Sequence, residues 1–342
     1  MRLSDLLGKH NNQAEKPSSP VTDKLEEKPA KTPEISVKVT GQKPPEQERK
    51  KETASHPAEI RNLYDSMILF MFDIVENLKV TDENILRKAK EMNETAINEL
   101  LKDNERLSVL TMFSTPANLI VSHSVNVCIL SIKLGIGLGY SKDRLVFLGI
   151  SALLHEIGKM NIEQAELSER VKENRGFVAR IKEQLQKYGI LNDSINEKEL
   201  EKISMVIRLL NFFETETHPD KLKEAKLPFD VIKMLVGSTD ADFDHSLIKK
   251  LIEELSIYPP GSFVHLGTGE IGMVVGVNRK FPTRPVVEIL IDREKKFVDP
   301  PRVINLVENP MAQIKEALNK NKINTEDRRF LQKLKVMEIW EK

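Results

Sequence analysis

The 342-residue sequence contains little cysteine, few aromatic residues and no net charge. Its single cysteine, Cys128, lies in an apolar stretch, which excludes an internal disulfide and fits a reducing compartment. Lysine plus arginine equal aspartate plus glutamate at 52 each, so no overall field favours nucleic acid or an anionic membrane. We therefore expect neither a disulfide-stabilised protein nor a nucleic-acid-binding one.

Long hydrophobic runs are also missing. A run such as Leu145–Leu154 extends for about ten residues, whereas a membrane-spanning helix needs roughly 20. The apolar stretch at the N-terminus is too short for a signal peptide. We expect a cytoplasmic protein without a membrane span.

The composition that remains is 40% hydrophobic and 30% charged, which is typical of a soluble and mostly helical protein. Residues 1–57, rich in Pro, Lys, Glu and Gln, are predicted to be a disordered tether, because such a segment buries too little apolar surface to offset its ordering entropy. At the start of this tether, Leu3, Leu6 and Leu7 form a short apolar stripe. This stripe is either a docking peptide for a protein partner or a frayed terminus.

The next part of the chain has helical periodicity. From Ile60 the apolar residues follow the i, i+3, i+4, i+7 spacing of one buried helix face, and residues 58–115 are predicted as lead-in helices. Residues 116–257 are predicted as an all-α bundle, because strands and helices do not alternate there. Its helices are expected at about 119–138, 144–157, 162–188, 197–213, 229–235 and 246–255.

After Tyr258-Pro259-Pro260-Gly261 the pattern changes to short β-branched segments separated by Gly-rich or Pro-rich turns. Residues 258–308 are therefore predicted as a small antiparallel β appendage, and residues 309–342 as a C-terminal helical tail. The strands of the appendage are expected at 262–266, 270–277 and 286–291. The predicted fold class is mainly α, a helical bundle with a small C-terminal antiparallel β appendage.

Two motifs carry candidate chemistry. His155-Glu156 ends a long apolar helix, where a buried imidazole and carboxylate are costly unless something pairs with them. His123 lies on the preceding apolar helix, and a divalent metal ion is the obvious partner for all three side chains. Lys159, just past the helix end, is placed to contact a phosphate oxygen. Taken singly, each histidine is more often a hydrogen-bonded core residue than a ligand.

These motifs resemble a known family. Ser122-His123-Ser124-Val125-Asn126-Val127 and Leu153-Leu154-His155-Glu156-Ile157-Gly158-Lys159 are similar to the opening of HD-GYP domains. These domains are a bacterial branch of the HD phosphohydrolase superfamily that hydrolyses cyclic di-GMP at a two- or three-metal site. The resemblance extends over about residues 60–306 and includes the β segment. It implies an HD-type bundle with His123, His155 and Glu156 as metal ligands.

The departures from the family pattern are as informative as the matches. No histidine and no Gly-Tyr-Pro occur between Lys159 and Glu214. The family's later ligand Asp corresponds to Asn211, whose amide oxygen carries no charge to balance a divalent ion. The name-giving Asp is Glu156, and its extra methylene moves the carboxylate by roughly 1.5 Å. The resemblance therefore implies a degenerate site that holds at most one weakly bound ion (Mn, Fe or Ni), or none.

Other polar residues are weaker candidates. His218 is a possible substitute ligand, but a histidine just before Pro219 is more often a solvent-facing turn residue. Asp240, Asp242 and Asp244 alternate like a calcium loop, yet the glycine expected at the sixth position is absent. We expect these carboxylates to cap the helix that starts near Ser246.

The hypothesis favoured by the sequence is a cytoplasmic bacterial signalling protein with a degenerate HD-GYP domain. It is expected to bind a protein partner, through the N-terminal peptide or the helical domain, or cyclic di-GMP, with little or no hydrolysis. One alternative is an active metal-dependent phosphohydrolase or cyclic di-GMP phosphodiesterase, with Lys159 on the phosphate. Another is a purely structural adaptor in which His123 and His155 are ordinary core residues.

Overall fold

The structure is a computed structural model of the chain. It describes residues 46–77, 82–102, 105–113, 119–156, 167–191, 195–218, 224–238, 243–320, 323 and 330. Lys159, Asp240, Asp242 and the leucines of the predicted docking peptide lie outside this part of the chain.

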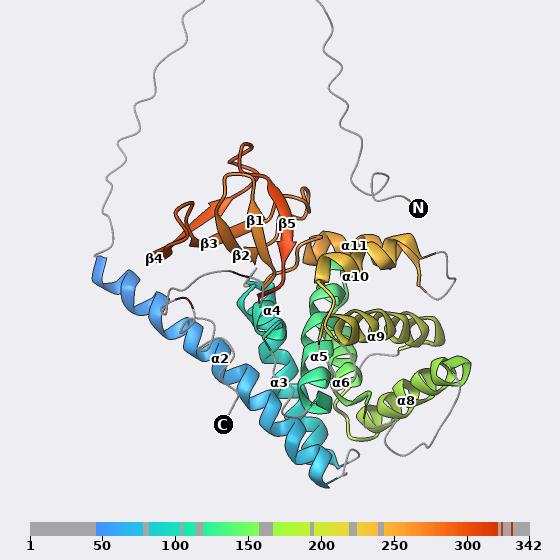
Figure 1. The fold of residues 1–342 in the computed structure, drawn as a ribbon. Coiled ribbons are helices and arrows are strands. Elements are labelled where there is room, and N and C mark those ends of the chain that lie inside the picture. Colours follow the sequence, from blue (N-terminus) through green and yellow to red (C-terminus); the bar gives the residue numbers. More distant parts are fainter. Residues whose placement is uncertain are drawn as a thin grey trace, which may run out of the picture.

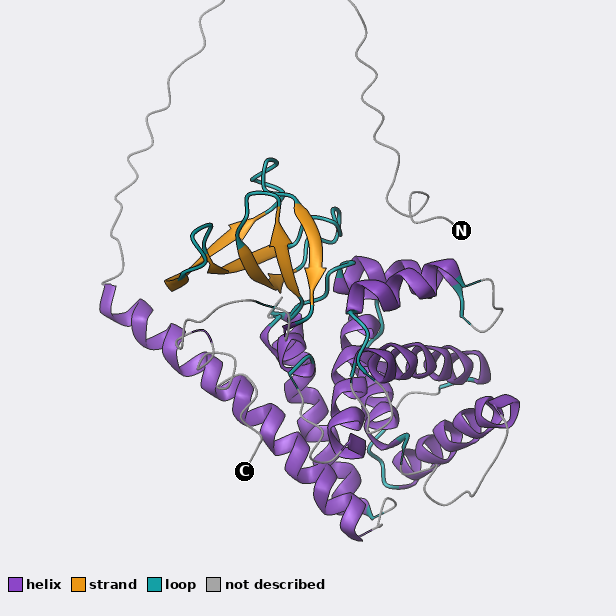
Figure 2. Cartoon of the chain, in the orientation of Figure 1, coloured by secondary structure: helices purple, strands orange, loops and turns teal. Residues whose placement is uncertain are grey.

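The described chain folds into a helical body followed by a small sheet (Figures 1 and 2). The helices are α2 (Glu46–Asn77), α3 (Glu83–Leu101), α4 (Arg106–Thr111), α5 (Leu119–Gly137), α6 (Lys142–Leu154), α8 (Leu167–Lys187), α9 (Glu197–Thr217), α10 (Pro228–Gly237) and α11 (His245–Leu255). The strands are β1 (Phe263–Leu266), β2 (Ile271–Gly276), β3 (Val286–Ile291), β4 (Phe297–Asn305) and β5 (Ile314–Leu318). The predicted fold class, a mainly α bundle with a C-terminal antiparallel sheet, is confirmed.

Helix α5 lies at the centre of the body. It packs against α2, α4, α6, α9 and α11, and most of its side chains are buried. A helix that is apolar on every face is stable only when other elements surround it, so this sequence places α5 in the core. Helix α6 runs next to α5 after a short turn, and Ser141 caps it by accepting a hydrogen bond from the backbone N–H of Arg144. The two central helices are those that the sequence predicts to be most apolar.

The stretch Ile120–Gly137 of α5 is long and apolar enough to cross a membrane, judged by length and composition. In the fold, however, 72% of this stretch is buried against the other helices. Its apolar character is accounted for by the core position, as in the core helix of a soluble protein.

Helix α9 has a well-defined start and a late end. Asn196 and Glu199 form a capping box at its N-terminus, in which each side chain bonds to the backbone N–H of the other residue. The sequence predicts an end near Phe213, but α9 continues to Thr217 with His218 as its C-cap. This extra turn carries Glu214 and His218 along the face of α9 that meets α5. The prediction of His218 as a solvent-facing turn residue is therefore wrong, because its side chain is only 12% exposed.

The sheet is antiparallel in the order β4-β3-β2-β1-β5. It has a small core of its own, and it meets the helical body at the end of α4 (Figure 1). There the rings of Phe113 and Phe263 pack edge to face, with centroids 6.2 Å apart. Gly261 has a positive φ of 92°, and a Cβ atom there would lie 2.7 Å from the Cβ of Met112. Glycine thus allows the chain to pass closely over α4 as it enters the sheet.

Two predicted segments differ from the structure. Helix α2 begins at Glu46, so the last part of the predicted tether, residues 46–57, is helical. That segment is rich in Glu, Gln, Lys and Arg, which are also good helix formers. Within the predicted helical tail, residues 314–318 form strand β5, because the exposed edge of β1 offers unpaired backbone groups that β5 satisfies.

Candidate metal centre

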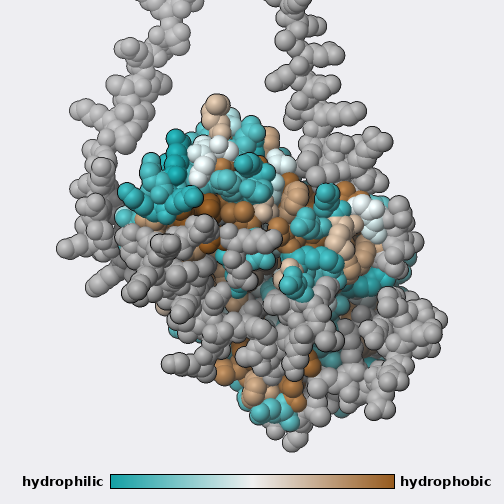
Figure 3. Space-filling view, in the orientation of Figure 1, coloured by the Kyte–Doolittle hydropathy of each residue, from teal (hydrophilic) through white to brown (hydrophobic). Residues whose placement is uncertain are grey.

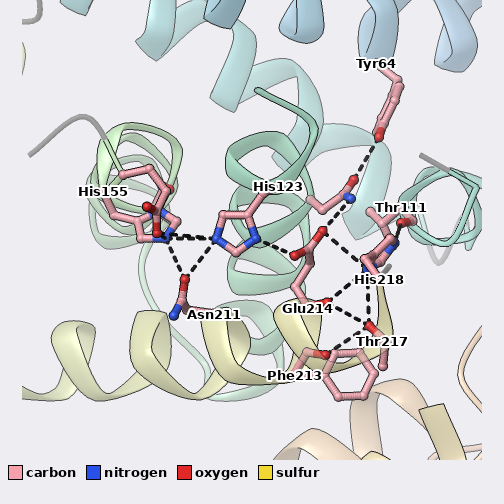
Figure 4. A network of polar contacts seen from close by, with 12 residues as sticks. Tyr64, Thr111, His123, His155, Asn211, Phe213, Glu214, Thr217 and His218 are labelled. Carbon is pink, nitrogen blue, oxygen red and sulfur yellow. Dashed lines mark hydrogen bonds and ion pairs between the residues drawn. The ribbon is translucent and has the colours of Figure 1, made fainter. Parts of the chain in front are cut away.

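Four side chains from three parts of the helical body converge on one point. His123 comes from α5, His155 and Glu156 from the turn that ends α6, and Asn211 from α9. The Nε2 atoms of His123 and His155 lie 3.3 Å apart, and each lies 2.9 Å from Oδ1 of Asn211. Oε1 of Glu156 lies 3.0 Å from Nε2 of His155 and 3.5 Å from that of His123. The structure therefore brings together all four residues that the sequence analysis names as ligands (Figure 4 shows three of them labelled).

The second nitrogen of each histidine is held by the protein. Nδ1 of His155 donates to the backbone carbonyl of Ala152 at 2.6 Å, and Nδ1 of His123 faces the carboxylate of Glu214. With the protons on the Nδ1 atoms, the lone pairs of both Nε2 atoms point toward each other. Such an arrangement needs a proton or a cation between the rings, and an Nδ1 anchored in this way is the usual outer-shell support of a metal-bound histidine.

The donor spacing fits a single divalent ion. In a tetrahedral site with metal–ligand distances of about 2.1 Å the donor atoms are roughly 3.4 Å apart, and in an octahedral site adjacent donors are roughly 3.0 Å apart. The observed separations run from 2.9 to 3.5 Å. Two imidazole nitrogens, a carboxylate and an amide oxygen form a donor set that suits Mn, Fe or Ni. His123, His155 and Glu156 are the one group of three potential ligand residues among the described positions.

A buried chain of hydrogen bonds lies behind His123, on the side away from the converging donors. Oε1 of Glu214 accepts a hydrogen bond from Nδ2 of Asn126 at 2.9 Å, and Oδ1 of Asn126 accepts one from the hydroxyl of Tyr64 at 2.8 Å. All three residues are buried, with Glu214 only 3% exposed. The chain runs from α2 through α5 to α9, so it fixes the orientation of the His123 ring relative to three helices.

His218 extends this chain to α4. Its Nδ1 lies 3.3 Å from Oε1 of Glu214, and its Nε2 donates to the backbone carbonyl of Thr111 at 2.7 Å (Figure 4). His218 therefore does not join the four converging donors. It supports the carboxylate that in turn holds His123.

Two ionisable groups in this region have strongly shifted pKa values. Burial alone would raise the pKa of Glu214, but the charge of His218 and the hydrogen bonds and charge of His123 lower it to about 2. Burial alone would lower the pKa of His123, yet hydrogen bonds and charges from Glu156 and Glu214 raise it to about 10. The raised pKa means that the His123 imidazole is charged near neutral pH in the metal-free protein.

Sequence analysis missed Glu214. A signal was present, because Asn211, Glu214 and His218 are spaced i, i+3, i+7 and so lie on one face of a helix. Because the helix was predicted to end at Phe213, Glu214 and His218 were not assigned to the same helix face as Asn211. Two neighbouring polar residues behave as expected: His245 is exposed, and Asp244 caps α11 by accepting from the N–H of Ser246 at 2.7 Å.

One protein family and two known proteins are similar to parts of this chain. Residues 263–326 match the family described as KOW domain associated with HD domain, and the matched region includes β5 and extends past the predicted end of the appendage at 308. The chain is 24% identical to cyclic di-GMP phosphodiesterase PdeB of Borreliella burgdorferi, covering 60% of this chain and 62% of PdeB. It is also similar to the solved structure of Bd1817, an HDG"Y"P protein from Bdellovibrio bacteriovorus, at 16% identity and a TM-score of 0.42, covering 55% of this chain and 69% of that one.

The KOW match and the similarity to PdeB confirm the resemblance to HD-GYP proteins that the motifs indicate. The chain spans less than two thirds of the length of PdeB.

Proposed function

We propose that this relative of the HD-GYP proteins binds one divalent metal ion through His123, His155, Glu156 and Asn211, and uses it to bind cyclic di-GMP with little or no hydrolysis. The observation that carries the proposal is the convergence of the donors: the two Nε2 atoms lie 2.9 to 3.5 Å from each other and from the oxygens of Glu156 and Asn211. The ion, when bound, supplies a Lewis acid for a phosphate oxygen. The similarity to PdeB supports the choice of ligand.

The protein's own groups would orient the site and tune its charge. Glu214 holds His123 through Nδ1, and the carbonyl of Ala152 holds His155, so neither ring has to reorganise when a ligand binds. The side chain of Glu156 is 21% exposed, against 15% for His123 and 1% for His155, so a ligand reaches the centre from the side of Glu156. Lys159 follows three residues later and is proposed to contact the phosphate.

Two features support binding over turnover. A two-metal mechanism needs a second set of donors with the ions roughly 3.5–4 Å apart. Of the other histidines whose side chains the structure describes, His218 is engaged with Thr111 and Glu214, His245 is exposed, and His265 pairs with Glu316 on the sheet. Asn211 also adds no negative charge, so the four donors carry one carboxylate against a divalent ion.

A specific observation also favours a second candidate, an active phosphodiesterase. All four donors of the first ion are present with ligand-like spacing, and the anchored histidines match the support that catalytic metals require. In this case a metal-activated water would be the nucleophile. Metal analysis combined with binding and turnover assays separates the two candidates.

The test uses the full chain with its metal. We expect about one Mn, Fe or Ni per chain by elemental analysis, and cyclic di-GMP binding by calorimetry that weakens more than tenfold after chelation. His155→Ala should abolish both, whereas His245→Ala, an exposed histidine on α11, should change neither. Turnover of cyclic di-GMP that His155→Ala abolishes would establish the phosphodiesterase instead.

Absence of metal, together with cyclic di-GMP binding that chelation does not affect, would overturn the proposal. If neither metal nor dinucleotide binds, the purely structural adaptor is the remaining interpretation of the fold.

We also propose a protein partner in the reducing cytoplasm, docked through Leu3, Leu6 and Leu7 or through the helical body. The apolar stripe on a polar, Pro-rich segment supports the partner. The free, buried thiol of Cys128 is compatible with the reducing compartment. Affinity capture with the wild-type chain and with a Leu3→Ser/Leu6→Ser/Leu7→Ser variant tests it. A partner retained equally by both would exclude the leucines as the docking element.

A further inference from the structure

Helix α2 lies along one side of the helical body and carries a group of apolar side chains on its outer face (Figure 1). Leu69 and Phe72 are 67% and 41% exposed, and Ile68 and Val75 beside them are half-buried. Their spacing places the four residues on one face of the helix, which we call the α2 patch. Figure 3 shows hydrophobic residues at the surface toward the lower end of the molecule, where Figure 1 places the second half of α2.

The surroundings of the α2 patch are acidic. Asp73 and Glu76 are exposed and follow one turn after the two exposed members of the patch, and the last turn of α2 has no basic residue. Asp65, one turn before the patch, pairs with Arg61 at 3.3 Å. The carbonyl groups at the end of the helix add negative partial charge. An occupant that fits this surface combines apolar side chains with positive charges.

A second copy of α2 does not meet this requirement, because it would bring the acidic ends of two patches together, and like charges across a contact destabilise it. The start of the chain does meet it. The leucine stripe has Arg2 before it and Lys9 after it, and we call residues 2–9 the leucine segment. On a helix its one acidic residue, Asp5, is on the side opposite the leucines.

The chain between the leucine segment and α2 has the length that a contact with the patch needs. Residues 10–45 have the composition from which the tether is predicted. A flexible chain of this length has a root-mean-square end-to-end distance of roughly 30–36 Å. The helix rises about 35 Å between Glu46 and Leu69. A tether whose length matches the span gives an effective concentration in the millimolar range, so a weak contact is enough to keep the segment docked.

We propose that the leucine segment docks on the α2 patch of the same chain, with its leucines against Leu69 and Phe72 and its cations toward Asp73 and Glu76. The contact goes beyond the proposed function, because it needs neither the metal ion nor the dinucleotide. A protein partner that takes the same leucines competes with the patch, so the contact sets how readily such a partner binds.

Disulfide trapping in the full chain tests the contact, because the single native cysteine, Cys128, is buried. Ser4→Cys/Ser66→Cys places one thiol in the leucine segment and one beside the patch, and it keeps the patch and all three leucines. Ser4→Cys/Ala58→Cys is the matched control, since Ala58 is also exposed on α2 but lies nearer to the tether. In a glutathione redox buffer we expect the Ser66 pair to close within one chain on the order of tenfold faster than the Ala58 pair.

A further substitution tests the patch itself. In the Ser4→Cys/Ser66→Cys background, Phe72→Ser should slow the closure by a similar factor. Met234→Ser removes a side chain of similar exposure, 42%, from α10 and should leave the rate unchanged. Circular dichroism should remain that of the wild type in both variants, since both side chains are exposed. Equal rates for the Ser66 and Ala58 pairs, a rate that Phe72→Ser leaves unchanged, or disulfides between two chains in place of disulfides within one would overturn the proposal.

Discussion

The two sides of the His123 ring differ in how their polar atoms are satisfied. On the Nδ1 side, Glu214, Asn126 and Tyr64 form a closed chain in which each polar group has a partner inside the protein. On the Nε2 side, two imidazole nitrogens and two oxygens face one another, and only a proton or a cation between them satisfies the set. The Nδ1 side, the backing side, is a permanent part of the fold, whereas the Nε2 side, the ligand side, is the one proposed to hold an exchangeable ion.

The two sides also differ in how far they depart from the family pattern. The departures, Glu156 and Asn211, both lie on the side that is proposed to hold the ion. The backing side keeps a buried, ionised carboxylate, which is costly to bury without partners. A substitution should therefore affect mainly stability on one side of the ring and mainly metal affinity on the other.

The largest expected effect comes from breaking the backing side. Glu214→Ala leaves His123 and His218 without their carboxylate partner, so we expect the free energy of unfolding of the metal-free protein to fall by about 3–5 kcal/mol. Urea unfolding followed by circular dichroism measures this. Glu201→Ala, on the exposed face of the same helix, should change stability by about 0.5 kcal/mol or less. Equal losses in both variants would remove the distinction between the two sides.

A change on the ligand side should act on metal affinity instead. Asn211→Asp adds a negative charge at an atom 2.9 Å from both Nε2 nitrogens, so divalent metal should bind on the order of tenfold more tightly, or about 1.4 kcal/mol. Competition with a metal-binding dye measures it, and Asn196→Asp, which keeps a capping side chain on α9 away from the centre, is the control. Unchanged affinity would place Asn211 outside the coordination sphere.

The far end of the backing chain should show a smaller effect. Tyr64→Phe removes the hydroxyl that donates to Asn126 and keeps the buried ring, so it should cost about 0.5–1.5 kcal/mol of stability. Metal affinity should change less than twofold, since the bond between Asn126 and Glu214 remains. If the metal affinity of Tyr64→Phe falls as far as that of His155→Ala, the hydrogen bonds from Tyr64 to Glu214 and the metal centre act as one unit.

The smallest effect is expected at an exposed carboxylate, which gives the contrast to Glu214. Hydrogen bonds from Ser246 and the backbone N–H groups of the first turn lower the pKa of Asp244. A lowered pKa in the folded state means that this stabilisation is complete above the ordinary value of 3.8 and is lost as the pH falls through the folded value. Asp244→Asn should therefore cost about a few tenths of a kcal/mol near pH 7 and progressively less as the pH falls below that ordinary value, as urea unfolding over this pH range can test.

Local patterns in the sequence determined most of the helical framework and the identity of the converging donors. The apolar character of α5 and α6 placed His123, His155 and Glu156 at buried helix positions, and the family resemblance added Asn211. A helix that is apolar all round has to be surrounded, so this information is local and can be read from the chain. Their role as metal ligands remains a proposal.

Only the tertiary structure decided which partners stand behind and beside those residues. Glu214 and His218 became visible because α9 runs one turn further and packs against α5, and residues 314–318 became a strand because β1 offered an open edge. Each of these contacts joins segments far apart in the chain. The hydrophobic periodicity of one segment does not specify the surface against which it packs.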